Sequence, residues 1–364
     1  MNQILQYLHF NRRLVEVQYQ QTRIFGAHGT ATNKGIVFTD AGSQKPFLAQ
    51  AAQHFIDYHF FGAAAATVDL PRYRYTPEGE RIDNVTDWVL KQFRAHYGKA
   101  AALPSPHSPS EDGRPDGHPM AGEGGARSAT DEGAHGEVAA FAGRDEPAAG
   151  NPSSGPPAAV PSSGPSGPLL PQGEKGRGKR HLPRITKDDI FHYVYGVLHD
   201  PVYREKYALN LKREFPRIPF YPDFRQWADW GQRLMALHIG YEAVEPWPLT
   251  RRDEPDEEAR AAGIAPKCLL KSDREAGTIR IDSETTLSGI PPAAFVYRLG
   301  NSCGLDWILD QYKEKTPKDP TIREKFNTYR FADYKEKVID LIARVTRVSV
   351  ETMAIVEAMK EAAR

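Results

Sequence analysis

The sequence predicts an α/β fold class in three parts, which we place at residues 1–100, 101–180 and 181–364. The first part holds short apolar runs bounded by turn residues, a pattern typical of strands. The last part is dominated by amphipathic segments with helix-start signals. Between them, Gly, Pro, Ser or Ala occupy 50 of 80 positions. This leaves too few large apolar residues to offset the entropy cost of ordering the segment. We therefore expect a mixed α+β N-terminal part, a long disordered insert and a mainly helical C-terminal part.

Strand candidates come first along the chain. Residues 14–19 form a short strand-like stretch, and Gly35–Thr39 is a continuous apolar run that suits a buried strand. Asp57–Phe61 suits another strand. Arginine alternates with tyrosine through Arg72–Tyr75, which indicates an edge strand with Arg72 and Arg74 on one face.

Helix-start signals follow. Asn84 is a suitable N-cap for a helix that runs to Phe93. Thr186, with an acidic residue three positions later, predicts a capping box. Asp200 before Pro201 predicts a further start, because Asp caps a helix and Pro suits its first position.

The rest of the C-terminal part is mainly helical by pattern. Three prolines make Phe215–Pro222 extended, and a long amphipathic helix is predicted over Asp223–Tyr241. Thr278–Ile281 is the one strand candidate. Helices are also predicted over Leu305–Tyr312 and Tyr334–Arg344, with Ser349 capping a separate last helix.

Composition excludes several classes of protein. The 47 basic and 47 acidic residues cancel, so net charge gives no argument for nucleic acid. Two cysteines exclude a disulfide framework and a four-cysteine zinc site, and they fit a reducing cytoplasm. No apolar run is long enough to span a bilayer, and the N-terminus lacks the features of a signal peptide.

Sequence motifs for catalysis are absent. There is no phosphate-binding loop, no G-x-S-x-G and no H-E-x-x-H. Asp200–Tyr203 resembles the Asp-Pro-Pro-Tyr of amino-methyltransferases, but its third residue is Val, which favours a helix cap. Cys303 follows Ser302, a predicted N-cap, and a helix start can lower a thiol pKa. We expect both features to be structural, and we expect no metal site.

Loops rich in basic and amide side chains are the remaining candidates for function. Such side chains contact phosphates and read base edges. A solvated helical surface is the simpler interpretation of the same charges. The candidate DNA-binding residues are Gln44, Lys45, Arg72, Arg74, Lys212, Arg213, Arg217, Arg298, Asn301, Lys313, Lys315 and Lys318.

Long, ordered strings outside 101–180 carry a resemblance to a known family. They resemble the C-terminal target-recognition (specificity) domain of Type ISP enzymes, which are Type I-like, single-polypeptide restriction-modification enzymes. The strings are Leu8–Arg13, Lys45–Phe47, Asp83–Trp88, Ile185–His199, Tyr203–Tyr207, Leu211–Glu214, Arg217–Pro219, Tyr297–Asn301, Leu305–Tyr312 and Asp319–Asn327.

This resemblance implies a non-catalytic module that recognises a duplex DNA target for phage defence. Family enzymes join a nuclease, a translocating ATPase and an adenine N6-methyltransferase to this domain. AdoMet, ATP and Mg²⁺ would serve those absent domains, so we expect no cofactor in this chain. The chain begins inside the resemblance, so we expect a fragment or a separate subunit, with a decayed gene as a further alternative.

Two other functions stay open. The first is an interaction module that docks on a methyltransferase or translocase subunit and has little DNA affinity alone. The second is an enzyme that uses Cys303 or the Asp200 segment. A cytoplasmic protein without a membrane partner is expected in each case.

Overall fold

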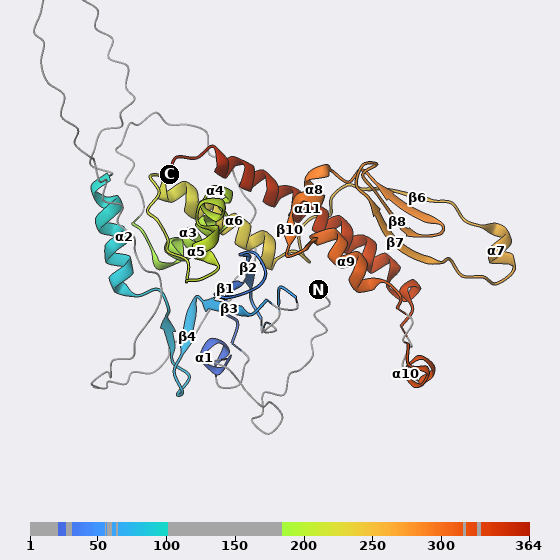
Figure 1. Cartoon of the computed structure of the whole chain (residues 1–364), viewed down its shortest axis with the longest axis horizontal. Helices are drawn as coiled ribbons and strands as arrows, with labels where there is room; N and C mark the ends of the chain where they lie inside the picture. The colour runs from blue at the N-terminus through green and yellow to red at the C-terminus, as the bar shows by residue number, and fades with distance from the viewer. Residues whose placement is uncertain are drawn as a thin grey trace, which may run out of the picture.

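The computed structural model describes residues 21–26, 31–54, 56, 60–62, 65–100, 184–315, 318–325 and 329–364 (Figure 1). The predicted strand at 14–19 and the predicted disordered insert at 101–180 lie outside these residues. Of the predicted strand Asp57–Phe61, Phe60 and Phe61 are described, and they form a turn.

A small antiparallel sheet follows the short helix α1 (Gln21–Phe25). Its strands are β1 (Gly35–Thr39), β2 (Ala49–Ala52) and β3 (Thr67–Pro71), in the order β2-β1-β3. The central strand β1 is buried at every residue, which confirms the interpretation of its apolar run. The alanine-rich β2 escaped prediction because alanine carries little strand signal.

A hairpin and a helix complete the N-terminal part. Strands β4 (Tyr73–Tyr75) and β5 (Arg81–Asp83) pair, and α2 (Asp87–Ala100) follows. The predicted cap was wrong: Thr86 Oγ1 accepts from the Val89 amide at the start of α2. Asn84 instead donates to the Pro71 carbonyl, and so ties the hairpin to β3.

The first two helices after residue 184 begin where their caps predict. In α3 (Lys187–His199), Thr186 and Asp189 form a complete capping box. Asp200 caps α4 (Pro201–Lys206), which is followed by α5 (Ala208–Leu211). Asp223 caps α6 (Phe224–Ile239). The segment 215–222 between α5 and α6 is non-helical, as its prolines require.

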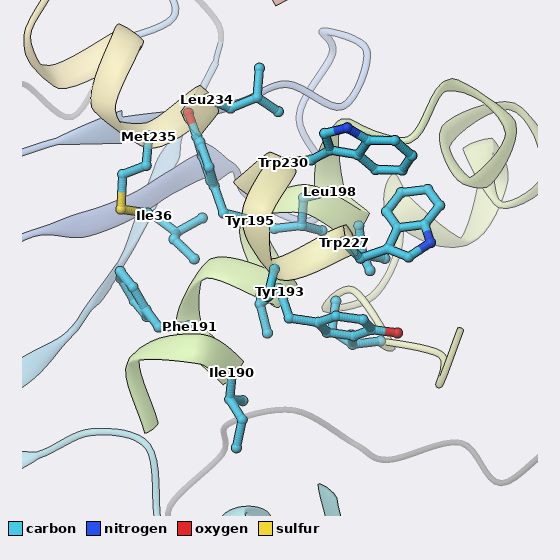
Figure 2. Close-up of a cluster of buried hydrophobic side chains, with 14 of the residues drawn as sticks. Ile36, Ile190, Phe191, Tyr193, Tyr195, Leu198, Trp227, Trp230, Leu234 and Met235 are labelled. Carbon is cyan, nitrogen blue, oxygen red and sulfur yellow. The ribbon is translucent and has the colours of Figure 1, made fainter. Parts of the chain in front are cut away.

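The first hydrophobic core lies where α3 and α6 pack on the N-terminal sheet. Figure 2 shows Tyr193 and Tyr195 of α3 with Trp227 and Leu234 of α6, together with Ile36 of β1. The core therefore joins side chains from residues 1–100 and 181–364. The predicted domain division remains a prediction, but packing connects its first and third parts.

The C-terminal part is mainly helical, as expected, but it also holds a second sheet, of which the sequence predicted one strand, Thr278–Ile281. Strands β6 (Thr250–Asp253), β7 (Cys268–Asp273), β8 (Thr278–Asp282) and β9 (Thr285–Ser288) pair in the order β6-β9-β8-β7, with α7 (Glu257–Ala261) after β6. Every residue of β6 is exposed, so this edge strand has no apolar pattern that reasoning from sequence could detect.

One long helix links the second sheet to the first core. Between the sheet and this helix come α8 (Pro292–Val296), β10 (Arg298–Leu299), β11 (Ser302–Cys303), α9 (Gly304–Tyr312), α10 (Pro320–Lys325) and the 3-10 turn η1 (Phe331–Tyr334). The helix α11 (Lys335–Lys360) is continuous, so the predicted break at Ser349 was wrong. Ser349 Oγ donates to the Val345 carbonyl within the helix instead of capping a new one.

The two ends of α11 belong to different cores. Val338 and Ile342 pack in the second core, below the four-stranded sheet, whereas Ile355 and Met359 pack in the first core. Figure 1 shows α11 running from the sheet to α4 and α6. Within the described residues, no helix combines the length and apolarity required to cross a membrane.

Candidate nucleic-acid interface

The loop between β1 and β2 lies against the turn that follows α5. The Gly42 amide donates to the Lys212 carbonyl at 2.7 Å. The loop is also held internally, because the Lys45 amide donates to Ser43 Oγ and the Leu48 amide to Thr39 Oγ1, each at 3.2 Å. Two sequence-predicted groups, Gln44 with Lys45 and Lys212 with Arg213, are therefore carried by loops in direct contact.

The β10–β11 hairpin also approaches the β1–β2 loop, near Leu48. Its turn residue Gly300 has φ of 77°, a conformation that favours glycine. A β-carbon there would lie 3.4 Å from the Phe61 carbonyl oxygen and 3.7 Å from Leu48 Cδ1. The hairpin carries Arg298 and Asn301, both exposed, so a third predicted group joins the first two.

The extended segment after α5 packs on β1 through an aromatic contact. Phe215 meets Phe38 edge-on with ring centroids 5.6 Å apart, yet it remains 46 % exposed. Arg217 lies two residues further on and pairs with Glu214 at 3.1 Å. Sequence reasoning missed Phe215, although a large aromatic among basic residues in a proline-rich segment is a usable signal.

We call these elements the three-loop face: the β1–β2 loop, the turn and extended segment 212–217, and the β10–β11 hairpin. The side chains of Gln44, Lys45, Lys212 and Arg213 have no hydrogen bond or ion pair with a described residue. Gln44, Lys212 and Arg213 are also exposed. They are therefore available to a ligand, and Lys212 and Arg213 are positively charged.

Arg72 has a different role from the one its alternation predicts. It precedes β4 instead of lying in it, and it is only 6 % exposed. Its guanidinium binds Asp83 at 2.5 Å and Asp188 at 2.6 Å, and so joins the hairpin to α3. The expectation of Arg72 and Arg74 sharing an exposed face is therefore corrected: Arg74 alone is exposed, on β4.

The predicted lysine turn lies at the C-terminal end of α9. Lys313, Lys315 and Lys318 are exposed, and Lys315 pairs with Asp310 at 3.3 Å. Lys313 lines a pocket of about 290 Å³ beside β7 and α9. This group lies beside the second core, at the end of α9 opposite the β10–β11 hairpin.

Cys303 has a structural position. It is itself the N-cap of α9, one residue later than predicted, and its Sγ accepts from the Asp306 amide at 3.3 Å. Burial raises the pKa of its thiol, which opposes formation of the nucleophilic thiolate.

Asp200 also has a structural role. It is fully buried, caps α4, and receives hydrogen bonds from Tyr221 Oη at 2.8 Å and Arg364 Nη2 at 2.7 Å. Across the described part of the chain, no group of three or more His, Cys, Asp or Glu residues has the arrangement to hold a metal ion.

Comparisons with known proteins identify the family to which this architecture belongs. The family model described as the Type ISP C-terminal specificity domain matches residues 4–341. No match was found among the curated proteins. Among solved structures, the chain is similar to one in a cryo-EM structure of a DrdV–DNA complex, with 40% identity and a TM-score of 0.68 over 98% of this chain and 27% of that one.

Two further structures share the fold at lower identity. One is a nuclease-deletion mutant of the Type ISP restriction-modification enzyme LlaGI in complex with a DNA substrate mimic (20% identity, TM-score 0.56, 97% of this chain and 23% of that one). The other is the ATP-dependent Type ISP enzyme LlaBIII bound to DNA (17% identity, TM-score 0.59, 97% of this chain and 17% of that one). This chain spans about a quarter or less of each. By its family match over residues 4–341, the chain belongs to the Type ISP C-terminal specificity domain family.

Proposed function

We propose that this chain is the target-recognition module of a restriction-modification system and that it reads duplex DNA through the three-loop face. The observation that carries the proposal is the convergence of three predicted groups, joined by the Gly42–Lys212 hydrogen bond and the approach of Gly300 to Leu48. Membership of a specificity-domain family supports it. So does the likeness to DrdV, whose structure is a DNA complex.

The chemistry of the face divides into two tasks. Lys45, Lys212 and Arg213 are cations suited to phosphates, which position a protein on DNA without reading its sequence. Gln44 and Asn301 carry amides that can bond adenine bidentately, and Arg298 carries the guanidinium that suits guanine. Because both kinds of side chain lie on adjoining loops, a single docking geometry provides both affinity for DNA and discrimination between bases.

We propose recognition without catalysis for this chain. Cys303 and Asp200, its two candidates for chemistry, cap helices and are buried. Methylation, translocation and cleavage, with their AdoMet, ATP and Mg²⁺, would then belong to a methyltransferase or translocase partner. Such a module would work in the cytoplasm, where the free thiols Cys268 and Cys303 stay reduced.

A second candidate function rests on length. Because the chain spans only 27% of the DrdV chain, it could be an interaction module that docks on a methyltransferase subunit and binds DNA only in the assembly.

Selection of duplexes from a random pool, followed by titration of the full chain, separates the two candidates. The first predicts enrichment of one sequence, bound at least about 1,000-fold more tightly than unrelated duplex at fixed salt. Equal affinity for every duplex would contradict it. Specific binding that appears only after a methyltransferase subunit is added would support the second.

A further inference from the structure

A largely buried polar network joins two elements next to the three-loop face. Gln50 of β2 donates from Nε2 to Tyr297 Oη at 3.2 Å. Tyr297 is the residue immediately before β10, so this bond joins the strand that ends the β1–β2 loop to the start of the β10–β11 hairpin. Tyr297 is only 9 % exposed.

His238 of α6 is the centre of the network. Its Nδ1 bonds Tyr195 Oη of α3 at 2.6 Å, and its Nε2 lies 3.2 Å from Tyr297 Oη and 3.0 Å from Thr352 Oγ1 of α11. The His238 and Tyr297 rings stack with centroids 5.5 Å apart. Tyr195 Oη also donates to Gln50 Oε1 at 3.3 Å, which closes the network on β2.

The network occupies the junction between the two hydrophobic cores. Thr352 lies on α11 between Ile342, which packs in the second core, and Ile355, which packs in the first. Apolar side chains can fill such a junction in several packings, whereas hydrogen bonds fix direction as well as distance. A fully bonded polar network therefore specifies one arrangement of the parts that it joins.

The protonation state of the network is constant near neutral pH. Burial, reinforced by the charge of Arg204, lowers the pKa of His238 to about 3. Burial raises the pKa of Tyr297 to about 12. The imidazole is thus neutral and the phenol protonated, so the same donors and acceptors face each other throughout the physiological range.

We propose that Tyr297 is a positioning residue for base discrimination: through its hydroxyl bonds to Gln50 and His238, it sets the β10–β11 hairpin against the β1–β2 loop. It acts on Arg298 and Asn301 without contacting DNA. The inference rests on the proposed function and deepens it, because it names what holds two of the reading loops in register.

The test compares two tyrosine hydroxyls in the full chain. Tyr297→Phe removes the network hydroxyl, and the matched control Tyr221→Phe removes a buried hydroxyl bonded to Asp200 outside the network. We expect Tyr297→Phe to lower the ratio of specific to non-specific affinity by on the order of tenfold. Non-specific affinity and its salt dependence should stay unchanged. Tyr221→Phe should leave the ratio unchanged.

A second variant removes the hydrogen-bond partner of the Tyr297 hydroxyl. Gln50→Leu removes the contact with Tyr297, together with that from Tyr195, without altering the hairpin. It should lower the ratio similarly, with no further loss in the double variant. It also keeps the inference testable if Tyr297→Phe fails to fold. An unchanged ratio in either folded network variant, or an equal fall in Tyr221→Phe, overturns the inference. A ratio near one in the unaltered chain overturns the proposed function and the inference together.

Discussion

Gly231 of α6 lies so close to His192 of α3 that a β-carbon on the glycine would sit 1.8 Å from the His192 carbonyl oxygen. The contact is reciprocal, since a β-carbon on Gly196 of α3 would sit 2.5 Å from the Trp227 carbonyl oxygen. Backbone therefore meets backbone where the two main helices of the first core cross. This crossing fixes the helical layer against which β2, the strand after the β1–β2 loop, packs.

Gly231→Ala should destabilise the fold severely. The new methyl group meets backbone atoms, which cannot swing aside as a side chain can, so the helices must separate. We expect a loss of about 3 kcal/mol or more in the free energy of unfolding, measured by urea denaturation followed by circular dichroism.

Gly98→Ala is the matched control. Gly98 also lies in a helix, α2, but nothing approaches within 4 Å of its added β-carbon. There alanine should stabilise by about 0.5–1 kcal/mol, because it restricts the unfolded chain and favours helix. Equal losses in the two variants would show that close helix packing is not the cause.

Arg72→Ala should weaken folding more than DNA binding. The guanidinium joins β5 to α3 through Asp83 and Asp188, and it is buried while these carboxylates are partly exposed. We expect a loss of about 2 kcal/mol in the free energy of unfolding. Arg74→Ala, two residues away and exposed, should change that free energy by less than about 0.5 kcal/mol. A large DNA-binding defect in Arg72→Ala at full folding would contradict the structural assignment.

The position of His238 predicts that the fold loses stability in acid. Its pKa is lowered by burial and by Arg204 in the folded chain, to about 3, against an ordinary 6.5. Between these values the unfolded chain binds the proton and the folded chain does not, so stability falls as pH drops below about 6.5. The groups that face the ring are Tyr195, Tyr297, His199, Thr352 and Arg204.

His238→Gln isolates this contribution, since glutamine keeps hydrogen-bonding capacity but does not titrate. The stability advantage of the unaltered chain over the variant should shrink by about 1.4 kcal/mol per pH unit below pH 6.5. Denaturation curves at pH 7.5, 6.5 and 5.5 measure the trend. A constant difference across these pH values would show that His238 titrates normally.

Local chemistry explains which parts of the fold could be predicted. Thr186 and Asp200 cap helices where their side chains predict, because capping depends on residues within one turn. The strand β6 and the continuous α11 could not be predicted in this way. Their boundaries depend on partners far along the chain: β9 pairs with β6, and two separate cores pack on α11.

The candidate site shows the same division. Residue type was enough to select Gln44, Lys212 and Arg298, but their loops are united by the backbone hydrogen bond of Gly42 and by the close approach of Gly300 to Leu48, which residue type does not reveal. The alternation at Arg72 was misleading because a buried cation with two carboxylate partners has the same local pattern as an exposed one.

Lys212 and Gln44 should give opposite signatures in DNA binding, although their loops touch. Lys212→Ala removes an exposed positive charge, so it should weaken binding to all duplexes alike and reduce the slope of log affinity against log salt by about 1. Gln44→Ala removes a neutral amide, so it should leave that slope unchanged and cost about 1–3 kcal/mol only at the base pair that it reads.

Lys91→Ala, an exposed lysine on α2, is the charge-matched control and should change neither quantity. The comparison is decisive because a non-specific electrostatic surface would respond to every lost lysine in the same way. If Lys91→Ala lowers the salt slope as much as Lys212→Ala, binding is spread over the whole surface and the three-loop face has no special role. If only Lys212→Ala lowers it, while Gln44→Ala relaxes the sequence preference, phosphate contact and base reading are assigned to adjoining loops.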